Sequence, residues 1–254
     1  MAADEWPRYR LPRRKLPGFA WSALTLRPRS VSRDAQTAVA CLRPPPEVLG
    51  GAHVPAKGPC LVACNHYSPP WFPSWWLTLS ISAAVASQRA PGADREVHWV
   101  MAGAWTYPDS AWRRRLVTPA TWWAFRRVAR VYGFVTMPPM PPDPSQVEAR
   151  AAAVRQTLRL ARALIPVGGM VGLSPEGQAV SDAHVTEPPP GVGEFIALLV
   201  RAGLPVLPVG VHDREGPLRL SFGPVFVPEI PADRRERDCV VARQVMDAIG
   251  RQLS

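Results

Sequence analysis

The sequence predicts an α/β fold in which helices flank a mixed β-sheet. Short apolar runs alternate with longer segments that carry apolar residues at helical spacing, which is the pattern of strands connected by helices. The length of 254 residues and a hydrophobic content of 47% are sufficient for the core of one large domain. Because 31 of the residues are proline, concentrated in turns, long uninterrupted helices should be few.

Residues 1–43 are expected to form a basic N-terminal arm that ends in a short helix. The first 30 residues mix arginine, proline and tryptophan without a helical or strand period, so they should be flexible unless a surface holds them. Ser32 is a suitable N-cap for a helix over 33–43, which the prolines at 44–46 end. The α/β domain then takes up residues 44–254.

The strands of this domain are predicted from short apolar runs bounded by proline, glycine or polar turns. These runs are 60–64, 97–101, 169–173, 206–211 and 218–227. Between them, residues 147–164 place apolar side chains at helical spacing and arginines largely on the other positions. Further helices are expected at 193–201 and 239–253.

The charge balance indicates an anionic partner. The chain has 30 basic and 20 acidic residues, a formal net charge of +10, which favours a phospholipid surface, a phosphate-bearing ligand or an acidic protein. In a helix from about Ala120, the residues Trp122, Phe125, Ala129 and Tyr132 share one face next to a strongly basic one. This is typical of a helix in a membrane interface, or of a helix that packs its aromatic face on the core. No recognisable nucleic-acid-binding module is present, so no nucleic acid partner is expected.

A peripheral or monotopic position on the cytoplasmic side of a membrane is predicted. No segment holds about 20 unbroken apolar residues, as a spanning helix requires, and the start of the chain is interrupted too early for a secretory signal. Residues 58–88 nevertheless contain no Asp, Glu, Lys or Arg and include three tryptophans. The four cysteines show no paired metal spacing, so a reducing compartment and no metal site are expected.

Two strand ends carry candidate functional residues. The strand at 60–64 runs directly into Asn65 and His66 and then into a Pro-Pro turn. A histidine at the carboxyl end of a strand is well placed to act as a general base, or it hydrogen-bonds the turn. Glu176 lies between Pro175 and Gly177 after another strand, where it binds substrate hydroxyls or is an exposed turn acid.

Taken in order, these segments resemble the glycerolipid acyltransferase family, which includes the lysophosphatidic acid acyltransferases. Segment 65–68, Asn-His-Tyr-Ser, is similar to the start of the family's first block. Segment 48–55 resembles the strand and Leu-Pro element that precede this block in the family. Segment 175–177, Pro-Glu-Gly, is similar to the core of the third block. Segment 193–209 resembles the helix and Pro-x-x-Pro strand of the fourth, and 221–224 resembles the final Phe-Gly strand.

The resemblance implies the family's α/β fold and transfer of a fatty acyl group at a membrane surface. The donor would be acyl-CoA or acyl carrier protein, the acceptor a hydroxyl or an amine, and no further cofactor or metal is required. His66 would be the catalytic base. The implied substrate-binding and positioning residues are Asn65, Ser68, Pro175, Glu176 and Gly177.

The sequence departs from the family pattern at the carboxylate and at two arginines. The first block is His, four residues, then Asp, but Trp71 stands at that last position here. Pro139 and Ala179 stand where the family has phosphate-binding arginines, which argues against a phosphate-headed acceptor. Two hypotheses follow: an active acyltransferase, and a lipid-binding or scaffolding protein that has kept the fold and lost the chemistry. Three carboxylates are available to replace the missing one: Asp109, Asp182 and Asp213.

Overall fold

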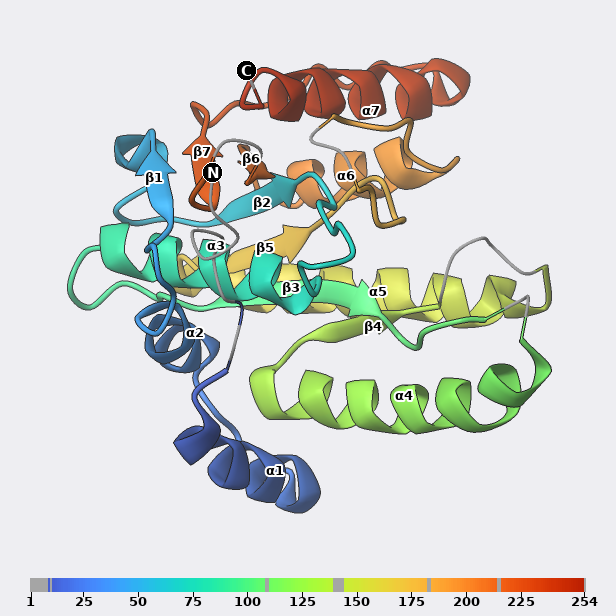
Figure 1. Cartoon of the computed structure of the whole chain (residues 1–254). Coiled ribbons are helices and arrows are strands. Elements are labelled where there is room, and N and C mark those ends of the chain that lie inside the picture. The colour runs from blue at the N-terminus through green and yellow to red at the C-terminus, as the bar shows by residue number, and fades with distance from the viewer. Residues whose placement is uncertain are drawn as a thin grey trace.

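A computed structural model describes residue 9 and residues 11–107, 110–138, 144–181, 184–213 and 216–253. It contains a seven-stranded sheet flanked by helices (Figure 1), which confirms the predicted fold class. The strands are β1 (Glu47–Leu49), β2 (Cys60–Cys64), β3 (Val97–Ala102), β4 (Val135–Met137), β5 (Met170–Leu173), β6 (Val206–His212) and β7 (Arg219–Phe222). The helices are α1 (Leu16–Thr25), α2 (Val31–Val39), α3 (Trp75–Gln88), α4 (Ala111–Tyr132), α5 (Val147–Leu164), α6 (Val192–Arg201) and α7 (Arg234–Gly250).

Five neighbouring strands of the sheet run in the same direction. The strand order is β1-β7-β6-β2-β5-β3-β4, and the pairs from β6 to β4 are all parallel. Only β7 and β1 run the other way, because β7 is antiparallel to β6 and β1 is parallel to β7. The carboxyl ends of β6, β2 and β5 therefore meet at one edge of the sheet. Side chains that follow these three strands can converge there.

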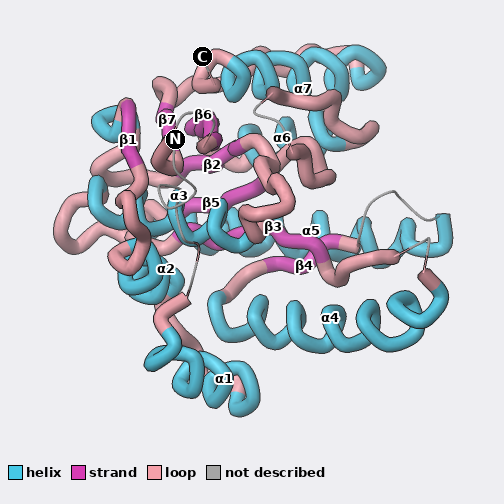
Figure 2. Tube along the Cα trace, in the orientation of Figure 1, coloured by secondary structure: helices cyan, strands magenta, loops and turns pink. Residues whose placement is uncertain are grey.

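Helices cover both faces of the central strand β2 (Figure 2). All five β2 residues are buried, and they alternate between two core clusters. Cys60, Val62 and Cys64 face the cluster that α2 and α3 complete, whereas Leu61 and Ala63 face the one completed by α5, α6 and α7. The continuous apolar run at 60–64 is thus explained by burial on both faces.

Several element boundaries differ from those expected. The strand at 218–227 ends at Phe222, and beyond it Phe226 forms only an isolated bridge with Val206. The helix expected at 239–253 begins at Arg234, because Asp233 accepts a hydrogen bond from the Arg235 backbone N–H at 2.8 Å and caps it. The helix expected from about Ala120 begins nine residues earlier, at Ala111.

The N-cap of α2 is Ser30 and not Ser32. The Ser30 hydroxyl accepts from the Arg33 N–H at 3.1 Å, so the helix covers Val31–Val39 instead of the predicted 33–43. Ser32 lies in the first turn, where its N–H and hydroxyl both donate to the Glu96 carboxylate, at 3.0 and 2.7 Å. The Ser30 hydroxyl also donates to Glu96, at 2.6 Å, so a distant carboxylate on the loop before β3 binds the start of this helix through both serines.

No helix was expected within residues 1–30, but residues Leu16–Thr25 form α1. This helix packs against α4 at the bottom of Figure 1. Arg127 of α4 donates to the carbonyls of Ala23 and Leu24 at 3.0 and 2.7 Å. These carbonyls lie in the last turn of α1, where helix hydrogen bonds are missing, so a cation stabilises them.

The uncharged stretch 58–88 is mostly core. It forms β2 and α3, and Phe72, Trp76 and Ile81 are at most 1% exposed, while Trp71 and Trp75 remain exposed. Among the helices that the structure describes, none is both long and apolar enough to cross a bilayer.

Candidate active site

His66 lies two residues beyond the end of β2, at the carboxyl edge of the sheet. Its backbone is held on both sides: the N–H donates to the Glu176 carboxylate, and the carbonyl accepts from Val180 N–H at 2.9 Å. Ser68 N–H donates to the Val180 carbonyl at 2.8 Å, so the chain after β2 pairs with the loop after β5. The histidine is therefore positioned by its main chain.

Glu176 links three segments of the site. Its side chain is 1% exposed, and its second oxygen accepts from the backbone N–H and the hydroxyl of Thr186 at 2.7 and 3.0 Å. A buried carboxylate is stable only when such donors replace water. Glu176 is thus not the exposed turn acid considered above; it joins the loop after β5 to His66 and to Thr186.

The His66 ring is half-buried, and its Nδ1 is buried without a hydrogen-bond partner among the residues that the structure describes. Burial lowers the pKa of His66 because it penalises the charged imidazolium, while the Gln178 backbone and the negative charge of Glu176 oppose this shift. The ring is accordingly neutral at neutral pH. A neutral imidazole nitrogen can accept a proton, which is what a general base requires.

The other residues of the two motif segments make contacts within the protein. The Asn65 side chain donates to the Val211 carbonyl at 2.9 Å and accepts from its N–H at 2.8 Å, which fastens the end of β2 to β6. The Ser68 hydroxyl donates to the Phe72 carbonyl at 3.2 Å. Pro175 is buried, and Gly177 adopts a positive φ of 65° in the turn. A substrate-binding role for these residues stays a prediction.

Trp71 is directed to Asp213. This carboxylate follows β6, is 1% exposed, and accepts from the Trp71 indole N–H at 3.3 Å. The Tyr67 hydroxyl donates to its other oxygen, and the Tyr9 hydroxyl donates at 3.0 Å. Burial and the negative charge of Asp213 raise the pKa of Tyr9. Asp213 therefore belongs to an aromatic cluster beside His66 and makes no hydrogen bond to the imidazole.

The structure thus brings His66 and Glu176 together, and it joins Trp71 to Asp213 in a separate cluster with Tyr67. Asp109, Asp182 and Pro139 lie outside the described residues. Sequence reasoning missed Thr186 and Tyr9, which lie in a proline-rich loop and in the N-terminal arm and carry no local signal. The joint position of Asp213 and His66 could have been inferred, because each follows the carboxyl end of a predicted strand.

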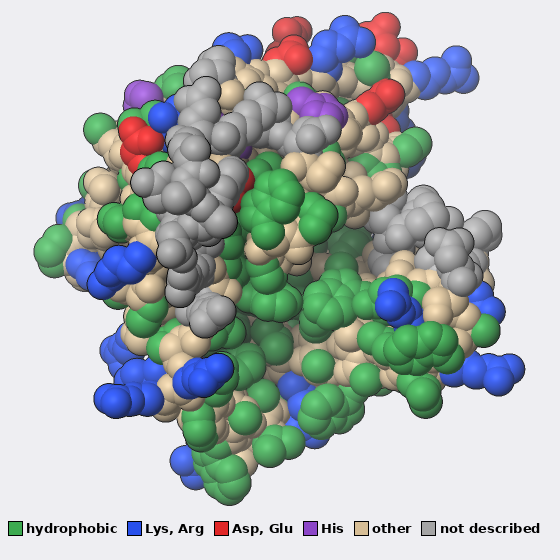
Figure 3. Space-filling model, viewed as in Figure 1, with side chains coloured by type: hydrophobic (Ala, Val, Ile, Leu, Met, Phe, Trp, Pro, Cys, Tyr) green, Lys and Arg blue, Asp and Glu red, His purple; other side chains and the backbone are tan. Residues whose placement is uncertain are grey.

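Three aromatic side chains form a chain of contacts between the start of α3 and α4. Trp75 at the start of α3 and Trp105 after β3 are 44% and 40% exposed, with ring centroids 6.5 Å apart. Trp105 meets Phe125 of α4 edge-on at 5.2 Å. In Figure 3, hydrophobic side chains line the hollow on this face of the molecule. Aromatic side chains therefore connect the start of α3 with α4.

No family model matches the chain, and no curated protein matches it. Among solved structures, the chain is similar to the crystal structure of the 1-acyl-sn-glycerophosphate (LPA) acyltransferase PlsC from Thermotoga maritima, with 16% sequence identity and a TM-score of 0.48. The similar region covers 96% of this chain and 83% of that chain.

Proposed function

We propose that the protein transfers a fatty acyl group from acyl-CoA or acyl carrier protein to a hydroxyl or amine acceptor at a membrane surface. The observation that carries this proposal is the joining of two motif segments at the sheet edge. His66 after β2 and Glu176 after β5 share a hydrogen bond, burial favours the neutral form of the His66 imidazole, and its Nδ1 is buried without a partner among the described residues. The exposed rings of Trp75 and Trp105 support an acyl substrate, because α3 follows the turn after His66 and such rings can bind a fatty chain.

The proposed reaction needs one base and no metal. His66 removes the proton from the acceptor hydroxyl, whose oxygen forms a bond to the thioester carbonyl carbon. The resulting tetrahedral intermediate collapses, and the carbon–sulfur bond breaks. The thiolate takes the proton from the imidazolium, so the products are the acyl ester and the free thiol, and His66 is again neutral.

Transfer assays with wild-type protein test the proposal. A labelled long-chain acyl group is supplied on coenzyme A and on acyl carrier protein. The acceptors are lysophosphatidic acid, a monoacylglycerol, a long-chain alcohol and a long-chain amine. We expect neutral acceptors to be used more than tenfold faster than lysophosphatidic acid, because two charge-assisted hydrogen bonds to phosphate are missing at Pro139 and Ala179. Preference for lysophosphatidic acid would show the acceptor inference to be wrong.

The pH profile of kcat/KM reports the protonation of the base. The rate is expected to rise with pH through a midpoint below 6.5 and to be constant above it, since burial lowers the pKa of His66 and only the neutral ring accepts a proton. In Glu176→Gln the midpoint should move to lower pH, because the negative charge that raises the pKa of His66 is removed. Asp213→Asn is the control and should leave the midpoint unchanged. A midpoint above 6.5 in wild type contradicts the assignment.

A second candidate function is lipid binding or scaffolding without catalysis. It is favoured by one observation: Trp71 stands at the position of the family's Asp and donates to Asp213, and no carboxylate among the described residues makes a hydrogen bond to the His66 ring. Loss of an orienting carboxylate costs on the order of 10⁴ in rate in the well-studied serine hydrolase triad. Absence of transfer with both donors and all four acceptors would support this candidate.

A further inference from the structure

We infer that the exposed face of α4 docks on a bilayer of anionic phospholipid. This proposal deepens the proposed function, on which it rests only in taking a membrane surface as the place of acyl transfer. It is carried by the arrangement of tryptophan and arginine on α4 and by the absence of acidic residues from that helix.

The face is defined by helix geometry and exposure. At 100° per residue, positions 112, 116, 123 and 130 fall within about 40° of one another. Trp112, Leu116 and Trp123 are 61%, 69% and 49% exposed, and Arg130 is exposed as well. The buried residues of α4, such as Val131, lie away from this stripe. Three large apolar side chains and a cation therefore point to solvent together.

The charge of this face is uncompensated. The 22 residues of α4 include six arginines and no Asp or Glu. Arg126 and Arg130 are exposed and make no hydrogen bond or ion pair within the described residues. In Figure 3 the region over α1 and α4 shows basic and hydrophobic side chains, whereas acidic ones lie near α7 and β1. Such a surface attracts anions and repels cations.

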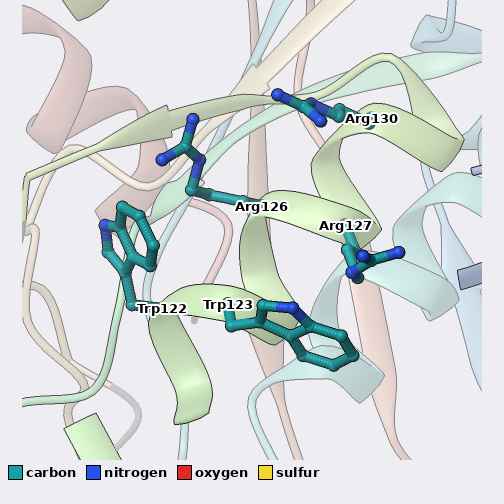
Figure 4. A pocket seen from close by; sticks show the side chains of 5 residues that line it. All are labelled: Trp122, Trp123, Arg126, Arg127 and Arg130. Atoms are coloured by element: carbon teal, nitrogen blue, oxygen red, sulfur yellow. The ribbon is translucent and has the colours of Figure 1, made fainter. Parts of the chain in front are cut away.

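Two tryptophans hold arginines on the helix surface. The Arg126 guanidinium lies 4.5 Å from the Trp122 ring centroid, and Arg127 lies 4.5 Å from that of Trp123 (Figure 4). Together with Arg130 these residues line a shallow cavity of about 150 Å³. Stacking on an indole does not use the N–H donors of a guanidinium, so those of Arg126 can donate to phosphate oxygens. Arg127 instead donates to the carbonyls of Ala23 and Leu24.

A bilayer fits this combination better than another polyanion. Tryptophan is enriched at the headgroup level of membranes, and arginine binds the phosphates there. The apolar side chains continue onto α1, where Trp21 and Leu24 are 57% and 58% exposed, next to Arg127. Nucleic acid and acidic proteins would leave these side chains in water.

The other side of α4 faces the aromatic side chains near the candidate active site. Phe125 of α4 contacts Trp105, which lies beside Trp75 at the start of α3. Trp71, exposed by 57%, is four residues before Trp75 on the turn that follows His66. Phe125 lies about 140–180° around α4 from positions 112, 116, 123 and 130, so the docking face and the aromatic side chains near the site lie on different sides of this helix.

Co-sedimentation with vesicles of phosphatidylcholine, with and without phosphatidylglycerol, tests the proposal. Wild type should bind the anionic vesicles more strongly and release them as salt is raised. The double variant Arg126→Gln/Arg130→Gln should partition about thirtyfold less into anionic vesicles. Arg127 is left unchanged because it holds α1. The matched control is Arg155→Gln/Arg159→Gln, two exposed arginines of α5 with the same charge loss, which should bind almost as wild type.

A second variant tests the contribution of the exposed tryptophans of α4 to vesicle binding. Trp112→Ala/Trp123→Ala should weaken binding to both kinds of vesicle, while thermal unfolding shows that the fold is kept. Equal binding to neutral and anionic vesicles, or equal losses in the α4 and α5 variants, would overturn the proposal. Tighter binding to single-stranded RNA than to vesicles would do so too. Because vesicle binding needs no turnover, its failure would leave acyl transfer in detergent micelles intact, which separates this proposal from the proposed function.

Discussion

His66→Ala is expected to lower acyl transfer by about 10²–10⁴-fold, the contribution of a well-placed general base. The substitution removes the imidazole and leaves the main-chain contacts of residue 66 in place. The hydrogen bonds of its N–H to Glu176 and of its carbonyl to Val180 do not depend on the side chain. The loss should therefore fall on kcat and not on folding. It is measured as steady-state transfer of a labelled acyl group with the best acceptor.

The control is His98→Ala, which removes a partly exposed histidine from β3. His98 contacts the Gly133 carbonyl at 3.0 Å and lies outside the candidate site. This variant should keep the wild-type rate. Equal circular dichroism and thermal unfolding of the two variants show that the comparison concerns chemistry. Robust transfer by His66→Ala would exclude His66 as the base.

Arg89→Met is expected to reduce the free energy of unfolding by about 3–5 kcal/mol. Arg89 ends α3 and is 3% exposed. Its guanidinium donates to the carbonyls of Asp94 at 2.8 Å, Pro55 at 2.9 Å and Gly58 at 2.8 Å, and also to that of Gly168. Since these carbonyls precede β2, β3 and β5, one side chain joins the amino ends of three strands. Methionine fills similar space but leaves the carbonyls without this donor.

Arg95→Met is the matched control on the same loop. Arg95 is exposed and has no hydrogen bond or ion pair within the described part of the chain, so its replacement should change stability by less than about 0.5 kcal/mol. Urea unfolding of both variants measures the difference. A loss below about 1 kcal/mol in Arg89→Met would mean that water replaces the guanidinium.

Strand and helix positions were predictable where burial alone determines the pattern. The runs at 60–64 and 147–164 coincide with β2 and α5. The first is apolar throughout, and the second keeps helical spacing of its apolar residues over its whole length. The short strand β4 and the helix α1 were not predicted. Both are short, and both are stabilised by contacts distant in sequence, such as the bonds from Arg127 to Ala23 and Leu24.

In the candidate site too, the sequence indicated some residues, and the structure alone revealed the contacts between them. The sequence alone indicated His66 and Glu176, because each follows an apolar strand and both belong to segments that resemble one family. It could not indicate that Glu176 accepts from Thr186, or that Trp71 and Tyr67 donate to Asp213.

The sequence by itself therefore determined the fold class, the central strands and the position of the histidine, since these depend on local hydrophobic periodicity. Only the tertiary structure decided which serine caps α2, whether α1 forms, and which carboxylate meets which donor. Those outcomes depend on pairs of residues far apart in the chain, such as Glu96 with Ser32 and Asp213 with Trp71. Their hydrogen bonds stabilise the protein only after folding has placed both partners within about 3 Å and removed the water between them.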